Sequence, residues 1–190
     1  MSWKIFEKNS RLYLKKIFEE IPSISFKSKG GANSLISDIE IMKNGESLFF
    51  IDCKLKVSQA AQFVVLNDTT KRKFHDSPLN KGESIRRHPI IEHMNKNYAS
   101  YSSPGQKKLL CEKNMMIDCI KKHFISKNIR FIISSLHHSN FKEFPIRITD
   151  IENLRRDFMV EGVYRNKKSG SSSLPKSERT IFKNIAKKNF

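Results

Sequence analysis

The order of apolar and polar residues predicts a helix followed by a β-hairpin in the first third of the chain. Four apolar residues recur at helical spacing and mark one face of a helix over about residues 10–21: Leu14, Ile17, Phe18 and Ile21. Residues 35–41 then alternate apolar and polar, and the turn pair Asn44-Gly45 leads into the apolar run of residues 48–55. We therefore expect two antiparallel strands joined at this turn.

The remaining pattern alternates between helical and strand-like segments. Residues 67–105 are polar, and prolines and glycines interrupt them. The other segments are expected as helices at 59–66, 106–127, 150–157 and around 181–185, and as strands at 129–135, 144–148 and 159–165. Strands interleaved with helices predict an α/β fold, in which a mixed central sheet is flanked by helices.

Chain length and composition favour one domain over residues 1–190, because 38% hydrophobic residues suffice for a core of this size. We expect a core of about residues 10–66 and 106–165. Residues 67–105 and 165–175 are then candidate insertions that contact a partner, since long irregular segments in a compact domain usually have a function.

Lys and Arg outnumber Asp and Glu by 36 to 19, which gives a formal net charge of +17. The excess is spread along the chain, and it suits a polyanionic partner such as nucleic acid. A ribosomal-type protein and the lysine bias of an AT-rich genome are alternative explanations. The three cysteines lack CxxC spacing, and neither a signal peptide nor a stretch long enough to span a membrane is recognised. A cytoplasmic protein is expected.

Chemistry concentrates in the predicted hairpin. Asp38 is followed after thirteen residues by Asp52-Cys53-Lys54, which close an otherwise apolar strand. Charged residues are costly at such positions unless they are used. Two carboxylates can hold a hard divalent cation, and a lysine beside them can orient an attacking water. In a lysine-rich chain the same pattern also arises by chance on a surface hairpin, and that alternative stays open.

This pattern, Asp38 with Asp52-Cys53-Lys54, resembles the PD-(D/E)xK nuclease superfamily, whose members include many type II restriction endonucleases. The resemblance covers about residues 19–62, and Ser37 replaces the usual proline before the first aspartate. It implies a restriction-endonuclease-like fold and a magnesium-dependent nuclease. By the same resemblance, Asp38, Asp52 and the Cys53 carbonyl hold the metal and Lys54 acts on the water.

Many members of the superfamily carry a further acid on the helix before the hairpin. Glu19 and Glu20 are the candidates here. At 100° per residue, Glu20 lies about 110° from the centre of the apolar stripe and Glu19 about 150°. Glu20 is therefore the expected fourth catalytic residue, with two solvated surface acids as the alternative.

The register of the hairpin tests the pattern. A two-residue turn at Asn44-Gly45 pairs Asp38 with Ile51 and sends Asp52 to the opposite face. A three-residue loop that starts at Lys43 pairs Asp38 with Phe50, so that Asp38, Asp52 and Lys54 share one face. The nuclease interpretation thus predicts the bulged loop, with Gly45 at positive φ.

Several further residues are expected at DNA, although a solvated surface explains each cluster equally well. The glutamines resemble those that some members of the superfamily place near the metal or the DNA backbone, and the basic side chains suit phosphates or base edges. The expected DNA-binding residues are Gln59, Gln62, Lys71, Arg72, Lys73, Arg86, Arg87, Arg165, Lys167 and Lys168.

Together these features predict a magnesium-dependent endodeoxyribonuclease acting on double-stranded DNA, a type II restriction enzyme by resemblance. A homodimer is expected, because two-fold symmetry matches a palindromic site. The alternatives are a repair nuclease or Holliday-junction resolvase on the same core, and a non-catalytic basic nucleic-acid-binding protein. The sequence does not indicate a recognition site.

Overall fold

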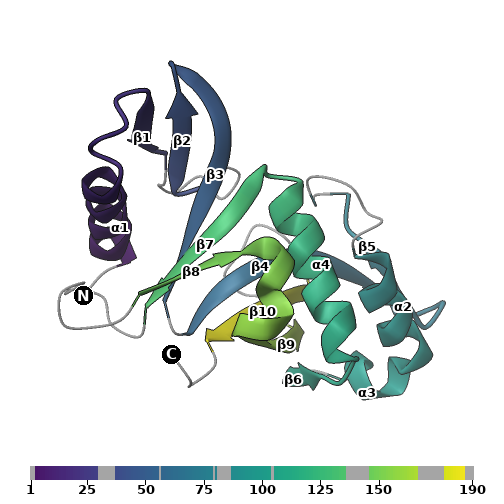
Figure 1. The fold of residues 1–190 in the computed structure, drawn as a ribbon. Helices are drawn as coiled ribbons and strands as arrows, with labels where there is room; N and C mark the ends of the chain where they lie inside the picture. The colour runs from purple at the N-terminus through teal and green to yellow at the C-terminus, as the bar shows by residue number, and fades with distance from the viewer. Residues whose placement is uncertain are drawn as a thin grey trace. The chain divides into compact units, whose positions relative to one another are not determined.

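A computed structural model describes residues 3–29, 37–55, 57–78, 80, 87–103, 105–135, 146–166 and 178–186 (Figure 1). The chain forms two compact units. The first comprises Met1–Ser58, Phe124–Met159 and Ile185–Phe190, and the second comprises Gln59–His123 and Val160–Asn184. Each unit is described by itself, and the expectation of one domain over residues 1–190 stays a prediction.

The first unit is built on a mixed five-stranded sheet of strand order β1-β2-β3-β7-β8. Its strands are β1 (Ile24–Ser28), β2 (Ile39–Lys43), β3 (Glu46–Leu55), β7 (Ile129–Ser135) and β8 (Ile146–Asp150). Only the central β3–β7 pair is parallel, whereas β1–β2, β2–β3 and β7–β8 are antiparallel. The expected α/β architecture with a mixed sheet is confirmed.

Helix α1 (Trp3–Ile17) covers one face of this sheet and determines which strand residues remain for chemistry. Its residues Phe6 and Leu14 are buried in one cluster with residues of four strands: Phe26, Ile39, Ile41, Ile51 and Ile133. Alternate residues of β3 pack against this cluster, including Cys53 and Leu55. Since side chains alternate along a strand, Asp52 and Lys54 leave β3 on the face opposite α1.

The hairpin turn differs from the expectation in an informative way. Asn44 and Gly45 form a two-residue turn with φ of 51° and 86°, so Lys43 pairs with Glu46 and the predicted three-residue loop is wrong. Strand β3 instead has one residue more than β2 at a β-bulge, where the register shifts between Ile41 and Met42. Beyond the bulge Ile39 pairs with Ile51, which leaves Asp38 and Asp52 as the next residues on neighbouring strands.

A second five-stranded sheet, of order β5-β4-β10-β9-β6, forms the second unit. Its strands are β4 (Val57–Asp68), β5 (Lys73–Asp76), β6 (Gly105–Leu109), β9 (Phe158–Asn166) and β10 (Glu178–Ala186). The chain also forms α2 (His88–Lys96), α3 (Tyr98–Ser102) and α4 (Lys113–Ile125). A Cβ on Gly162 of β9 would lie 2.7 Å from the Cβ of Leu109 on β6 and 2.9 Å from the sulfur of Met116 on α4, so this glycine leaves room for Leu109 and Met116.

Two helices predicted from the sequence are strands. The segment expected as a helix at 59–66 belongs to β4, where Ala61, Phe63 and Val65 are buried in alternation and Val65 pairs with Asp76 of β5. Its β-branched and aromatic residues favour a strand, a preference that the short periodicity did not reveal. The expected C-terminal helix around 181–185 is strand β10, between β4 and β9.

Other segments were predicted in part. Residues 67–105, which were expected to be irregular, contain β5, α2 and α3. Pro89 does not interrupt a helix there, because it lies in the first turn of α2, where its missing N–H is harmless. The helix expected at 106–127 is divided into β6 and α4. Strand β7 has the predicted bounds, and the 3-10 helix η2 (Ile151–Asn153) with α5 (Leu154–Asp157) forms the predicted short helix. None of the described helices is long and apolar enough to cross a membrane.

Candidate active site

Asp38 and Asp52 come together at the end of the β2–β3 pair in the first unit. Asp38 directly precedes Ile39, Asp52 directly follows Ile51, and those two isoleucines are register partners. The two carboxylates therefore enter the site from neighbouring strands at the same level. Asp52 is only 7% exposed, so its charge lies largely out of solvent.

Asp38 and Asp52 each have one short polar contact with the Asp52-Cys53-Lys54 segment. The backbone N–H of Cys53 donates to Asp38 Oδ2 at 2.7 Å, which holds Asp38 against β3. Lys54 Nζ forms an ion pair with Asp52 Oδ2 at 2.6 Å, and its side chain is 14% exposed. The structure thus brings all three residues of the predicted motif into one cluster.

The electrostatics of the cluster are those of crowded carboxylates. Burial and the neighbouring Asp52 charge raise the pKa of Asp38 from its ordinary 3.8 to about 8, although Lys54 and the Cys53 N–H oppose this. For Lys54, burial alone would lower the pKa, but the Asp52 and Asp38 carboxylates outweigh it and raise the pKa. Lys54 therefore stays a charged ammonium beside two acids.

A third acid joins the cluster from helix α1, and it is Glu7 rather than Glu20. The Glu7 side chain is hydrogen-bonded to Asp38, and its pKa is raised by burial and by the charge of Asp52. Glu20 lies exposed in the turn after α1. The predicted helix began too late to include Glu7, yet a signal was present: Glu7 stands two turns before Leu14 and so shares its buried side.

The residues present fit a hard, oxygen-preferring divalent cation such as Mg²⁺. Asp38 and Asp52 supply carboxylate oxygens. A cation beside them would offset both the burial and the Asp52 charge that raise the pKa of Asp38. The Cys53 thiol packs toward α1, and burial raises its pKa well above the ordinary value, so no thiolate ligand is available there. Among the described residues, no group of three or more His, Cys, Asp or Glu is arranged to enclose a metal. Mg²⁺ needs none, since it keeps waters and uses one or two carboxylates.

Three predicted DNA-binding residues lie at the turn between β4 and β5 of the second unit. Lys71 is exposed, and its Nζ lies 4.0 Å from Oδ2 of Asp68. The guanidinium carbon of Arg72 lies 5.7 Å from the centroid of the Tyr98 ring. Lys73 begins β5 and is exposed. The three side chains thus remain compatible with a contact to phosphate.

Arg87 has a structural role, which contradicts its assignment to DNA. It is 3% exposed, and its guanidinium donates hydrogen bonds of 2.7 to 2.9 Å to both oxygens of the Asp76 carboxylate. A buried guanidinium already paired bidentately cannot also present its edge to a base. Asp76 was not singled out in the sequence, because nothing local marks it as the partner of Arg87.

The remaining residues predicted to contact DNA either belong to strands of the second unit or lie outside the described residues. Gln59 and Gln62 belong to β4, and Arg165 belongs to β9 opposite Gln106 of β6. The glutamines therefore stand on a strand and not on the helix expected for them. Arg86, Lys167 and Lys168 lie outside the described residues, as does most of the candidate insertion at 165–175.

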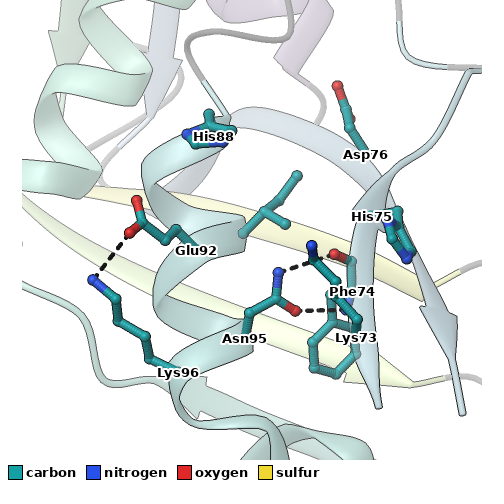
Figure 2. A pocket seen from close by; sticks show the side chains of 9 residues that line it. Lys73, Phe74, His75, Asp76, His88, Glu92, Asn95 and Lys96 are labelled. Carbon is teal, nitrogen blue, oxygen red and sulfur yellow. Dashed lines mark hydrogen bonds and ion pairs between the residues drawn. The ribbon is translucent and has the colours of Figure 1, made fainter. Parts of the chain in front are cut away.

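A pocket of about 640 Å³ lies between β5 and α2 of the second unit (Figure 2). Its polar lining includes His75, His88, Glu92 and Lys96, and Glu92 and Lys96 form an ion pair at 3.0 Å. Asn95 reaches across and forms two hydrogen bonds with the backbone of Phe74 (Figure 2). Asn95 thereby covers the outer edge of β5, which would otherwise present unpaired backbone groups.

Comparison with known proteins finds a similar fold. The structure of "HhaI endonuclease in complex with DNA" superposes with a TM-score of 0.83 and 23% sequence identity, over 100% of this chain and 93% of that chain. The restriction-endonuclease-like fold implied by the motif is therefore confirmed as a fold. No protein-family model matches the sequence, and neither does any curated protein.

Proposed function

We propose that the protein is a magnesium-dependent endodeoxyribonuclease that hydrolyses double-stranded DNA, and specifically a sequence-specific type II restriction endonuclease. The observation that carries the proposal is the cluster of Asp38, Asp52 and Lys54 at the end of neighbouring strands, within a fold similar to that of an endonuclease. A buried carboxylate with a raised pKa, as at Asp38, is unfavourable for folding alone, and such groups concentrate at functional sites.

In this proposal Asp38 and Asp52 hold the cation, and the Cys53 carbonyl is the third protein ligand. When bound, Mg²⁺ would supply Lewis-acid stabilisation of the phosphate and would make a nearby water a better nucleophile. Lys54 holds the attacking water by donating to it, and its raised pKa keeps it charged for this role. Glu7 supports Asp38 through their hydrogen bond.

The basic charge and the turn residues provide the DNA contacts in the same proposal. Lys71, Arg72 and Lys73 neutralise phosphates, and Gln59, Gln62, Arg165, Lys167 and Lys168 line the duplex. Arg86 remains the proposed base-reading arginine of the middle segment, now that Arg87 is assigned to Asp76. A homodimer on a palindromic site stays part of the proposal, and its mass in solution tests it.

One digest tests the proposal. Plasmid DNA is incubated with the protein and Mg²⁺, and the fragment ends are sequenced. Discrete fragments with identical ends are expected, and Asp52→Ala and Lys54→Ala should each lose cleavage by several orders of magnitude. Cleavage only at branched junctions would favour a resolvase. DNA binding without any cleavage, insensitive to chelation, would favour a non-catalytic binding protein.

A further inference from the structure

A buried hydroxyl lies next to the candidate site. Ser134 lies on β7 and is the register partner of Lys54 in the parallel β3–β7 pair. Neighbouring strands are about 4.8 Å apart, and register partners point to the same face. Ser134 therefore stands beside Lys54 on the face opposite α1, while Ile133 joins the cluster beneath that helix.

The Ser134 hydroxyl is buried at 0% exposure and has no hydrogen-bond partner among the residues that the structure describes. An unsatisfied buried hydroxyl costs stability, and alanine would fill the position without that cost. Buried polar groups without a partner are rare in folded proteins, and each calls for an explanation. Its position beside a charged lysine provides one.

Lys54 needs a second acceptor if Asp52 binds a cation. Its ammonium carries three donors, and its short contact is to Asp52 Oδ2. A cation held by the Asp52 carboxylate would compete with that contact. The side chain is mostly buried, so water replaces that acceptor only in part. The Ser134 oxygen is available on the adjacent strand at the same level.

We infer that Ser134 is a positioning residue for Lys54. Its hydroxyl oxygen accepts a hydrogen bond from the Lys54 ammonium and keeps the ammonium in the site when a divalent cation occupies the Asp52 carboxylate. The inference rests on the proposed function. Ser134 acts through Lys54 and does not touch the phosphate.

The structure offers a matched control in Thr149. It is 1% exposed, its hydroxyl also lacks a partner within the described part of the chain, and it pairs with Ile132 on the same face of the sheet. It lies on β8, one strand further from Lys54. Thr149→Val removes a buried hydroxyl of the same kind without changing volume, so it separates loss of any such hydroxyl from loss of the one beside Lys54.

The first test observes the lysine directly, without DNA. In ¹⁵N-lysine-labelled protein, the Lys54 ammonium signal is identified by its loss in Lys54→Arg. In EDTA the signal should be protected from solvent exchange in wild type, Ser134→Ala and Thr149→Val alike, because the Asp52 carboxylate accepts a hydrogen bond from the ammonium. In Mg²⁺ alone, exchange should become at least tenfold faster in Ser134→Ala only, and Ser134→Thr should restore protection. Equal exchange in wild type and Ser134→Ala with Mg²⁺ overturns the inference.

The second test is cleavage. Ser134→Ala should lower kcat about tenfold to a hundredfold, the range expected for one hydrogen bond to a charged group, while the KM for DNA and the thermal stability are not reduced. Thr149→Val should cleave like wild type. Cleavage by wild type with an unaffected Ser134→Ala refutes the inference and leaves the nuclease function. The expected exchange result without cleavage by wild type refutes the nuclease function and retains the Ser134–Lys54 contact.

Discussion

Replacing Asp38 by asparagine should make the metal-free protein more stable while it abolishes cleavage. Asparagine keeps an oxygen that can accept the Cys53 N–H, which now donates to Asp38 Oδ2. It removes the negative charge that burial and Asp52 disfavour. The gain in stability would show that the carboxylate is retained for function rather than for folding.

The magnitude follows from the pKa of Asp38. The rise from 3.8 to about 8 means that the folded protein holds a proton that the unfolded chain has already released at pH 7. This penalty is absent below about pH 4, grows with rising pH, and is complete above about pH 8. At pH 7 its ceiling is about 4 kcal/mol at 1.36 kcal/mol per pKa step. The pKa of about 8 already includes the attraction of Asp38 to Lys54, so we expect a gain of up to about 4 kcal/mol at pH 7, or up to about 8–16 °C in Tm.

Thermal unfolding in EDTA between pH 5 and pH 8 measures this effect. The difference in Tm between Asp38→Asn and wild type should widen as the pH rises. Glu20→Gln is the matched control, because it removes an exposed acid of the same unit and should change stability by less than about 0.5 kcal/mol. Added Mg²⁺ should stabilise wild type by mass action and leave Asp38→Asn unaffected. A variant that is less stable than wild type at pH 8, or equally shifted at every pH, would refute the reasoning.

Three further predictions follow from single contacts. Glu7→Gln should slow cleavage at least tenfold, because Glu7 contacts Asp38, whereas the exposed Glu20→Gln should not; equal rates in a plasmid assay would remove Glu7 from the site. Arg87→Ala should lower the free energy of unfolding in urea by about 2–4 kcal/mol, since it leaves Asp76 partly buried without its guanidinium, and site preference should persist in the folded fraction; a changed preference would return Arg87 to DNA. Asn95→Ala should cost about 1–2 kcal/mol and speed hydrogen exchange at the Phe74 amide, while unchanged exchange would mean that Asn95 does not cover the β5 edge.

Local sequence determined the chemical content of the candidate site. Asp38 and the Asp52-Cys53-Lys54 segment interrupt or close apolar strands, and a charge at such a position is visible without any structure. The apolar run of β7 likewise predicted its bounds, because a buried strand of a mixed sheet is apolar on both faces. These features depend on residues a few positions apart.

The tertiary structure decided everything that depends on pairing between distant segments. Residues 59–66 include β-branched and aromatic residues that favour a strand, but their place between β5 and β10 depends on pairing with distant segments. Asp38 lies opposite Asp52 because the register of the β2–β3 pair shifts by one residue at a bulge between Ile41 and Met42, and not at the turn. No residue type near Ile41 predicts a bulge. Glu7, Arg87 with Asp76, and Ser134 beside Lys54 acquired their positions in the same way. Sequence reports which side chains are available, but the register of long-range contacts, which depends on packing of the whole sheet, decides which of them meet.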